Sequence, residues 1–435
     1  MKFGGTSVGG AAAIGQVVEV VRSQLQRRPV VVVSAHAGVT DALLAAARAA
    51  ATGEADTGAI VARHREILRG LSLDEHLLDP LLDELRDLAR GVRLVGETSA
   101  KVVDAMASYG ERLSSRVVAA ALNANGVEAE AVDSFAAGLR TDSSFGRARP
   151  QPDDGRILRH LQGVRGVPVM TGFLGADEHG NITTLGRNGS DYSAALIGAA
   201  IGAEEVQIWK DVDGVHTADP RLVADAQPIR RMSFADVADL ASFGSKVLHP
   251  AAMVPAMQQG IPLRVRNTLS PEAEGTTIEA EVEASRPVVR AIAHRDHVAL
   301  ITVRSHRLVP QHAFLAKVFS KLDDIECDVG PVAVGEAAVT VAVEEPFAER
   351  AAARLQGHGE VQQTSGRAVV GVIGDASVLE NGGIGEVLSE LARAGIAVRC
   401  AGLGALGSTV AFAVASERLT ETVQLLHRRF FSATR

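Results

Sequence analysis

Hydrophobic and polar positions along the chain follow two different periods. Short apolar runs rich in β-branched residues predict buried strands, which we place at 29–34, 127–132, 167–173, 206–210 and 261–265. Apolar residues at helical spacing predict helices between these runs, at 11–24, through a helical section at 41–95, and at 101–122. Strands that alternate with helices are typical of an α/β domain built on a largely parallel sheet.

The last third of the chain repeats one order of elements. Strand, helix, strand, strand and helix are predicted at 298–303, 311–322, 327–334, 338–343 and 346–356, and again at 369–373, 384–394, 396–400, 409–414 and 419–428. This order predicts two ferredoxin-like βαββαβ modules. We therefore expect a first domain at 1–282 and two modules at 290–364 and 365–435.

Composition narrows the class of protein. The 435 residues suffice for two or three domains, and a hydrophobic content of 46% gives them sizeable cores. The net charge of -8 argues against general nucleic-acid binding, so small molecules or other subunits are the expected partners. Cys327 and Cys400 form neither a disulfide framework nor a metal-binding spacing, which favours a reducing, cytoplasmic compartment. The opening residues are not those of a signal peptide, and no apolar window is long enough to span a membrane.

The stretch NITTLGRNGSDYSAAL at 181–196 is typical of a strand end, a glycine-rich turn and the start of a helix. We expect Ser190 and Asp191 to cap that helix. The free N–H groups at its start and the guanidinium of Arg187 would converge on a carboxylate or a phosphate, while Asp191 can orient a cation. Taken alone, the stretch also fits an ordinary capped turn.

A second glycine-rich stretch, KFGGTSVGG at 2–10, precedes the helix at 11–24. Such a loop presents backbone N–H groups and the hydroxyls of Thr6 and Ser7 to phosphate oxygens, and Lys2 can add a positive charge. The P-loop pattern GxxxxGK[ST] is absent from the sequence. Only two residues precede the loop, so its strand is either very short or truncated. A flexible glycine run is the alternative.

Four further residues are candidates for binding. Ser34 and Thr40 follow the strand at 29–34, beyond the carboxyl end where ligands bind in such sheets. Glu111 follows a glycine among small residues of the helix at 101–122 and can bind an ammonium group, although a surface glutamate is the usual alternative. Lys246 can meet phosphates near a helix start.

Four collinear motifs together resemble aspartate kinase: KFGGTSV at 2–8, TTLGRNGSDYSA at 183–194, DVDGVHTADPR at 211–221 and FGSKVLHP at 243–250. The resemblance covers residues 2–280, and the tail resembles the paired ACT modules that follow the kinase domain in that family. It implies an amino-acid-kinase fold, a three-layer αβα sandwich followed by two ACT modules. It also implies transfer of the γ-phosphoryl group of ATP to the side-chain carboxylate of L-aspartate, giving 4-phospho-L-aspartate on the way to lysine, threonine and methionine.

The resemblance also implies roles for single residues. The phosphate loop would contain Lys2, Gly4, Gly5 and Ser7. The aspartate site would contain Thr40, Glu111, Arg187 and Ser190, with Ser34 beside them, and Asp191 would organise the catalytic Lys2. The nucleotide positions are Lys210, Asp211, His216, Arg221 and Lys246. Mg²⁺ would be bound through the nucleotide phosphates, without dedicated protein ligands, and a homodimer or higher homo-oligomer is expected.

The sequence departs from the family pattern at several of these positions. His216 stands where Tyr is usual, Lys210 where Thr or Ser is usual, and Asn188 where Gly is usual. Asn enters left-handed backbone conformations more easily than most residues, so position 188 tolerates it. In the first module Ala313 replaces a glycine, and the effector segment of the family is not evident at 332–336. An amino-acid effector at the modules is therefore one option and dimerisation alone another. A catalytically silent, amino-acid-binding regulatory relative is the alternative function.

Overall fold

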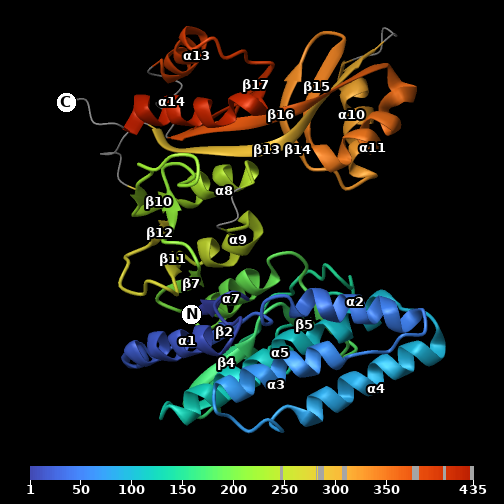
Figure 1. Cartoon of the computed structure of the whole chain (residues 1–435), viewed down its shortest axis with the longest axis vertical. Helices are drawn as coiled ribbons and strands as arrows, with labels where there is room; N and C mark the ends of the chain where they lie inside the picture. Colours follow the sequence, from blue (N-terminus) through green and yellow to red (C-terminus); the bar gives the residue numbers. More distant parts are fainter. Residues whose placement is uncertain are drawn as a thin grey trace. The chain divides into compact units, whose positions relative to one another are not determined.

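The computed structural model describes residues 1–244, 248–280, 282, 289–305, 311–374, 382–404 and 408–431. The chain forms two compact units, coloured by sequence in Figure 1. The first contains Met1–Val215 and Leu248–Ala280, and the second contains His216–Val247 and Glu281–Arg435. None of the described helices is both long enough and apolar enough to cross a membrane.

The first unit is built on a mostly parallel sheet. Within this unit the strand order is β12-β11-β7-β1-β2-β4-β3. The strands are β1 (Lys2–Phe3), β2 (Val31–Val33), β3 (Ala129–Val132), β4 (Val167–Thr171), β7 (Val206–Lys210), β11 (Leu263–Asn267) and β12 (Thr276–Glu279). Neighbours pair in parallel except β11 and β12, which pair antiparallel. The strand before the N-terminal loop is therefore very short and lies near the middle of the sheet.

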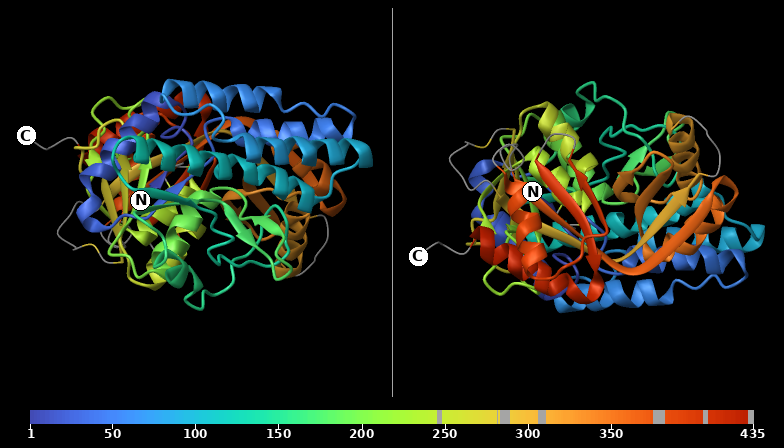
Figure 2. Two further views of the ribbon diagram at one scale, coloured as in Figure 1. Left: turned by 90° about the horizontal axis from the view of Figure 1, so that it is seen from below. Right: turned by 90° about the horizontal axis from the view of Figure 1, so that it is seen from above.

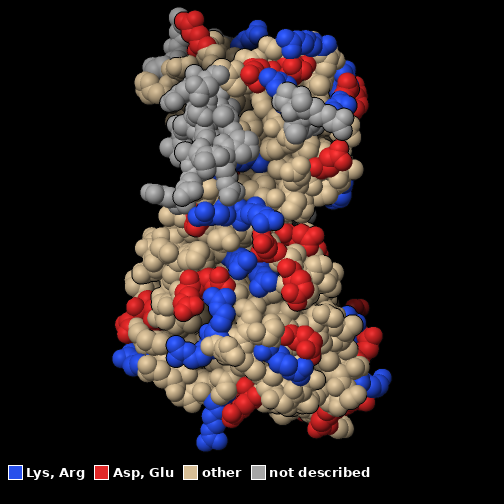
Figure 3. Space-filling model, turned by 90° about the vertical axis from the view of Figure 1, so that its left-hand side faces the viewer, with Lys and Arg blue, Asp and Glu red and all other residues tan. Residues whose placement is uncertain are grey.

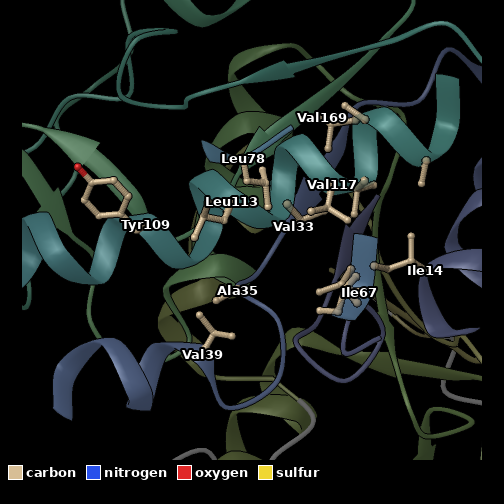
Figure 4. Packing of buried hydrophobic residues seen from close by; sticks show 14 of the residues in the cluster. Ile14, Val33, Ala35, Val39, Ile67, Leu78, Tyr109, Leu113, Val117 and Val169 are labelled. Atoms are coloured by element: carbon tan, nitrogen blue, oxygen red, sulfur yellow. The ribbon is translucent and has the colours of Figure 1, made fainter. Parts of the chain in front are cut away.

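Helices cover this sheet. The predicted helical section at 41–95 forms three helices, and the described helices of the unit are α1 (Ala11–Ser23), α2 (Val39–Ala51), α3 (Gly58–Gly70), α4 (Asp79–Val95), α5 (Ala100–Ala124), α6 (Arg156–Leu161), α7 (Gly189–Ala200) and α9 (Pro250–Gln258). Helices α1 to α5 lie together on one side of the strands (Figures 1 and 2). Their apolar faces share one buried cluster with residues of the strands. The cluster includes Val117 of α5, Val33 of β2 and Val169 of β4 (Figure 4).

The period-2 alternation of a strand decides which way Lys2 points. Phe3 belongs to the α1–α5 cluster and stacks on Trp209, with ring centroids 5.9 Å apart. Successive side chains of a strand point to opposite faces, so Lys2 points to the other side of the sheet. Helix α7 contacts β1, β2 and β7. The sequence prediction of a three-layer αβα domain is confirmed.

A short antiparallel hairpin leads the chain into α7. It consists of β5 (Leu174–Ala176) and β6 (Ile182–Thr184), which pair with Leu174 opposite Thr184. The turn that follows β6 contains Arg187. Helix α7 begins at Gly189, one residue before the predicted cap at Ser190 and Asp191, and its N-cap is Asn188.

The second unit holds the two predicted modules in one antiparallel sheet of order β14-β15-β13-β16-β18-β17. Its strands are β13 (Val289–Arg304), β14 (Val329–Val334), β15 (Ala338–Glu344), β16 (Glu360–Gly374), β17 (Cys400–Leu403) and β18 (Thr409–Ala415). The helices are α10 (Gln311–Asp323), α11 (Glu345–Leu355), α13 (Gly383–Arg393) and α14 (Leu419–Phe431). Each module has a hydrophobic core of its own.

The two modules share their long central strands. The second half of β13, Val298–Arg304, pairs with β15 and with the first half of β16. The first half, 289–295, pairs instead with residues 369–374 of β16, and the register shifts beside His297, whose φ is 54°. Residues 289–295 thus supply the sixth element of the second module, which the sequence pattern at 369–428 lacked. The domain limits at 282, 364 and 365 stay a prediction.

The segment between the two parts of the first unit packs within the second unit. It contains β8 (Val215–His216), β9 (Pro228–Ile229), β10 (Arg231–Ser233) and α8 (Phe234–Ser242). Helix α8 begins with a capping box formed by Ser233 and Asp236. Asp236 also pairs with Arg290, and Asp239 accepts a hydrogen bond from Ser408 Oγ at 2.7 Å. The side chains of α8 therefore bind both β13 and the residue before β18.

Candidate active site

The N-terminal loop lies at the carboxyl ends of the central strands. The N–H of Gly4 donates to the carbonyl of Trp209 at 3.3 Å, and Ser7 Oγ lies 2.8 Å from Thr268 Oγ1, just after β11. Gly5 passes close to the chain after β2, because a Cβ at this position would lie 3.1 Å from the carbonyl oxygen of Ala35. Gly4 is buried and Gly5 is half-buried, so the loop packs closely at the edge of the sheet where ligands of such sheets bind.

The start of α7 is held against the end of β4 by close backbone approach. A Cβ on Gly172 would lie 2.7 Å from Ser190 Cβ, and one on Gly189 would lie 2.6 Å from Phe173 Cδ2. Asn188 reaches the helix through a left-handed conformation with φ of 56°, and its side chain makes no capping bond. The N–H groups of the first turn therefore end at the same edge of the sheet as the loop.

A buried ion pair joins the loop and the helix. Lys2 Nζ lies 2.7 Å from Asp191 Oδ1, and Lys210 Nζ lies 3.4 Å from Asp191 Oδ2. Lys2 and Asp191 are 5% and 4% exposed. Burial alone would raise the pKa of Asp191, but the two ammonium groups outweigh burial and hold the pKa below its usual range. Asp191 thus holds two lysines side by side, and its role in organising a catalytic Lys2 stays a prediction.

Lys210 stays partly accessible. Burial is the largest effect on its ammonium and lowers the pKa from the usual value, and the neighbouring charge of Lys2 adds to this shift. Asp191 acts in the opposite direction. Two cationic groups on one carboxylate leave a net positive charge, which is suited to an anionic ligand.

Glu111 is buried rather than exposed, which excludes the surface alternative. It lies on α5 at 3% exposure, and its Oε1 accepts a hydrogen bond from the N–H of Ala35 at 3.1 Å. Its Oε2 has no hydrogen-bond partner among the described residues. Burial raises the pKa of Glu111 to about 8. An incoming ammonium group would satisfy the free oxygen and favour the ionised carboxylate.

The other predicted aspartate-site residues lie near these groups in the fold. Ser34 follows β2, is half-buried, and its N–H donates to the carbonyl of Phe3 at 3.1 Å. Thr40 lies half-buried in the first turn of α2, and Ser190 is 9% exposed in the first turn of α7. Arg187 is exposed in the turn before α7, four residues ahead of Asp191. Their roles in binding stay a prediction.

The predicted nucleotide residues are less closely grouped. Asp211 is exposed after β7. His216 and Arg221 belong to the second unit, where Arg221 pairs with Asp219 at 2.6 Å. Lys246 lies outside the described residues.

Sequence reasoning missed Asp104, a buried carboxylate of α5. Asp104 Oδ2 accepts hydrogen bonds from the N–H groups of Thr184 at 2.8 Å and Gly146 at 2.9 Å, and Oδ1 accepts one from Thr184 Oγ1 at 2.9 Å. Its burial raises its pKa. Asp104 and Glu111 are seven residues apart and so lie on one face of the helix, which was the available signal. Through these bonds α5 fixes the end of β6, just before the turn that carries Arg187.

Comparison with known proteins identifies the family. The sequence profile described as the amino acid kinase family matches residues 1–267. Lysine-sensitive aspartokinase 3 of Escherichia coli is 33% identical over 99% of this chain and 98% of its own length. The chloroplastic aspartokinase 1 of Arabidopsis thaliana is 32% identical over 100% of this chain and 80% of the plant protein.

The chain belongs to the aspartokinases of the amino acid kinase family. Among solved structures, E. coli aspartokinase III in complex with aspartate and ADP superposes with a TM-score of 0.81 at 31% identity, over 99% of both chains. The same enzyme in complex with lysine and aspartate also gives 0.81, at 30% identity. The fold of this aspartokinase, including its strand-rich C-terminal part, is therefore that of the family throughout the chain.

Proposed function

We propose that this aspartokinase transfers the γ-phosphoryl group of ATP to the β-carboxylate of L-aspartate, giving 4-phospho-L-aspartate and ADP. The reaction would open the route to lysine, threonine and methionine. The observation that carries the proposal is the Lys2–Asp191–Lys210 cluster, which joins the glycine-rich loop to the start of α7. The similar E. coli structure contains aspartate and ADP, the substrate and the nucleotide product of this reaction.

Alignment and charge neutralisation account for the catalysis. The nucleophile is a carboxylate that is already ionised at neutral pH, so the site needs no general base. In our proposal Lys2 and Lys210 neutralise the charge that builds on the transferred group, and the N–H groups of the loop hold the phosphate oxygens. Asp191 keeps Lys2 in place. No residue of the cluster has to accept a proton during the transfer.

Recognition of aspartate would use two oppositely charged groups. The exposed guanidinium of Arg187 can take the α-carboxylate in a bidentate pair, and the free Oε2 of Glu111 can take the α-ammonium. Ser34, which follows β2, and Thr40 and Ser190, in the first turns of α2 and α7, would complete this site. The predicted nucleotide positions Asp211, His216, Arg221 and Lys246 remain part of the proposal.

Mg²⁺ would enter with the nucleotide. Among the described residues, no group of three or more His, Cys, Asp or Glu side chains is placed to hold a metal ion. Mg²⁺ usually keeps several waters and binds through substrate phosphates and one or two carboxylates. The exposed Asp211, next to Lys210 in the chain, would supply one such carboxylate. The ion would supply additional positive charge on the phosphates.

The modules of the second unit would bind an amino-acid effector or a second copy of the chain. A similar structure of E. coli aspartokinase III contains lysine, which supports an amino-acid effector here. We further propose a homodimer or higher homo-oligomer, as is expected of the family. A cytoplasmic location is supported by Cys327 and Cys400, which are both free thiols.

A coupled assay of ADP release tests the proposed reaction. The purified chain is supplied with ATP, Mg²⁺ and either L-aspartate, L-glutamate or carbamate, and the acyl phosphate is trapped with hydroxylamine. We expect ADP release and hydroxamate formation with L-aspartate. Turnover with glutamate or carbamate but not with aspartate would reject the proposal. Aspartate binding without product would instead establish the silent regulatory alternative.

A further inference from the structure

A cavity lined by charged side chains lies between α3 and α4, away from the proposed active site. Its volume is about 690 Å³, and it is lined by Arg65 and Arg69 of α3, by Arg86, Arg90 and Arg93 of α4, and by residues 55–58. We call it the arginine cavity. None of the residues that line it belongs to the proposed active site. Its volume lies in the range of small-molecule sites.

Helix periodicity turns the arginines toward this cavity. Arg65 and Arg69 are four residues apart, and Arg86, Arg90 and Arg93 follow at intervals of four and three, so each helix has its arginines on one face. Other positions of both helices are buried, including Ile60, Ile67 and Leu68 on α3 and Leu82, Leu85 and Ala89 on α4. Like charges at these spacings repel one another. Ion pairs with acidic side chains at the rim offset this repulsion.

The charge of the lining is unbalanced. Asp56 is the single acidic side chain among the residues that line the cavity, against five guanidinium groups. On the face shown in Figure 3, basic and acidic groups are intermingled. Carboxylates at the rim pair with four of the five arginines. Asp79 lies 3.2 Å from Arg65, Glu75 lies 2.8 Å from Arg69 and Asp87 lies 3.4 Å from Arg90, and Asp83 pairs with Arg86. Exposed pairs of this kind are weak, so a multivalent anion can compete with them.

We propose that the arginine cavity binds a small polyphosphate anion, either inorganic polyphosphate or the phosphate tail of a nucleotide. Guanidinium groups pair with phosphate in a bidentate manner, and five of them around one cavity can hold two or more phosphate groups. Thr57, the N-cap residue of α3, and Gly58 line the same cavity, where the N–H of Gly58 donates to Asp56 Oδ1 at 2.7 Å. A cavity of this volume fits a small ligand better than an extended nucleic acid.

Titration calorimetry of the full chain with inorganic tripolyphosphate tests this site. The decisive variant is the double substitution Arg90→Gln with Arg93→Gln, which leaves the proposed active site intact. The matched control is Arg393→Gln on α13. Like Arg90, Arg393 is an exposed arginine paired with an acidic residue three positions earlier, which is Glu390 for Arg393 and Asp87 for Arg90. We expect the double variant to weaken one class of tripolyphosphate binding by at least about tenfold, and the control to bind as the unmodified chain does. The aspartate-dependent turnover measured without added polyphosphate should be the same in all three proteins.

The source of the phosphate is decided by a parallel titration with ATP. Loss of one ATP equivalent in the double variant assigns the cavity to a nucleotide, and loss of tripolyphosphate binding alone assigns it to inorganic polyphosphate. Tripolyphosphate binding that is equal in the double variant and the unmodified chain would overturn the proposal. So would a clear preference for a single-stranded oligonucleotide over tripolyphosphate. The proposed kinase reaction is measured separately, so its failure and the failure of this site are distinguishable.

Discussion

At the residue scale, the position of Lys2 follows from a strand of only two residues. Phe3 is fixed in the α1–α5 core, and strand alternation then directs Lys2 to the opposite face, where it pairs with Asp191 in the first turn of α7. The ion pair between them is buried, so its geometry is set by its surroundings rather than by solvent. A shift of the register of β1 by one residue would exchange Phe3 and Lys2 between the two faces.

We predict that Lys2→Ala lowers the turnover number by about 10²–10³-fold, because it removes one donor of positive charge to the transferred group. The KM for aspartate should change by less than about threefold, since Lys2 is assigned to the phosphates. Steady-state kinetics with aspartate as the varied substrate measures both. Lys101→Ala, at an exposed lysine of α5, is the control. Unchanged turnover in Lys2→Ala would show that the lysine is misassigned.

Glu111 gives the aspartate site a pH dependence. Its pKa is raised to about 8, so below that pH the carboxyl is largely protonated and must lose a proton before it can pair with an ammonium group. The dissociation constant of aspartate should therefore fall as pH rises from about 6 to about 8, by up to about tenfold per pH unit, and then level off. Calorimetry of aspartate binding across this range measures the slope. Glu111→Gln should remove the slope, and a flat profile in the unmodified chain would contradict the assignment.

At the element scale, Asp104 holds two segments next to the proposed aspartate site, the loop at Gly146 and the end of β6 at Thr184. We expect Asp104→Ala to raise the KM for aspartate by about tenfold with a smaller effect on turnover, because β6 and the loop at Gly146 lose three hydrogen bonds. Asp104→Asn keeps an acceptor for the two N–H groups, and the hydroxyl of Thr184 can accept from its amide. This variant should recover most of the affinity, whereas equal losses in both variants would point to a general effect on folding.

The turn before α7 depends on a left-handed residue. Asn188 has a φ of 56°, which a β-branched side chain adopts only at a cost of about 1–2 kcal/mol. We predict that Asn188→Val lowers the free energy of unfolding by about that amount, while Asn188→Gly, which restores the residue usual in the family, leaves it unchanged or slightly higher. Urea denaturation measures both. Equal stability of the two variants would show that the turn relaxes to another conformation.

At the scale of the whole molecule, the second module depends on a strand that precedes the first. Residues 289–295 pair with 369–374, so a fragment of 365–435 lacks one of its four strands and exposes the edge of β16. We predict that this fragment does not unfold cooperatively, whereas the fragment 289–431 does. Circular dichroism during thermal unfolding distinguishes them. A cooperative transition in the shorter fragment would show that the borrowed strand is dispensable.

The sequence predicted the layers of the first domain, whereas the roles it gave to the ligand-binding residues stay predictions. What it could not predict has physical reasons. Periodicity and the two glycine-rich stretches are local signals, so the strands, the loop at 2–10 and the turn before α7 could be predicted. Strand sharing by β13 is a long-range pairing that no local pattern encodes, and the strand predicted at 396–400 lies instead at Cys400–Leu403. The hydrogen bonds of Asp104 likewise join segments 42 and 80 residues away in the chain.

The measurement that tests the account most directly is a crystal structure with aspartate and a non-hydrolysable ATP analogue bound. We predict that Lys2 Nζ contacts a phosphate oxygen while remaining beside Asp191. The α-carboxylate of aspartate should pair with Arg187 and its ammonium with Glu111, with the β-carboxylate directed at the terminal phosphate. A complex in which Lys2 and Arg187 contact ligands on separate surfaces, or in which aspartate binds away from the start of α7, would contradict the central claim.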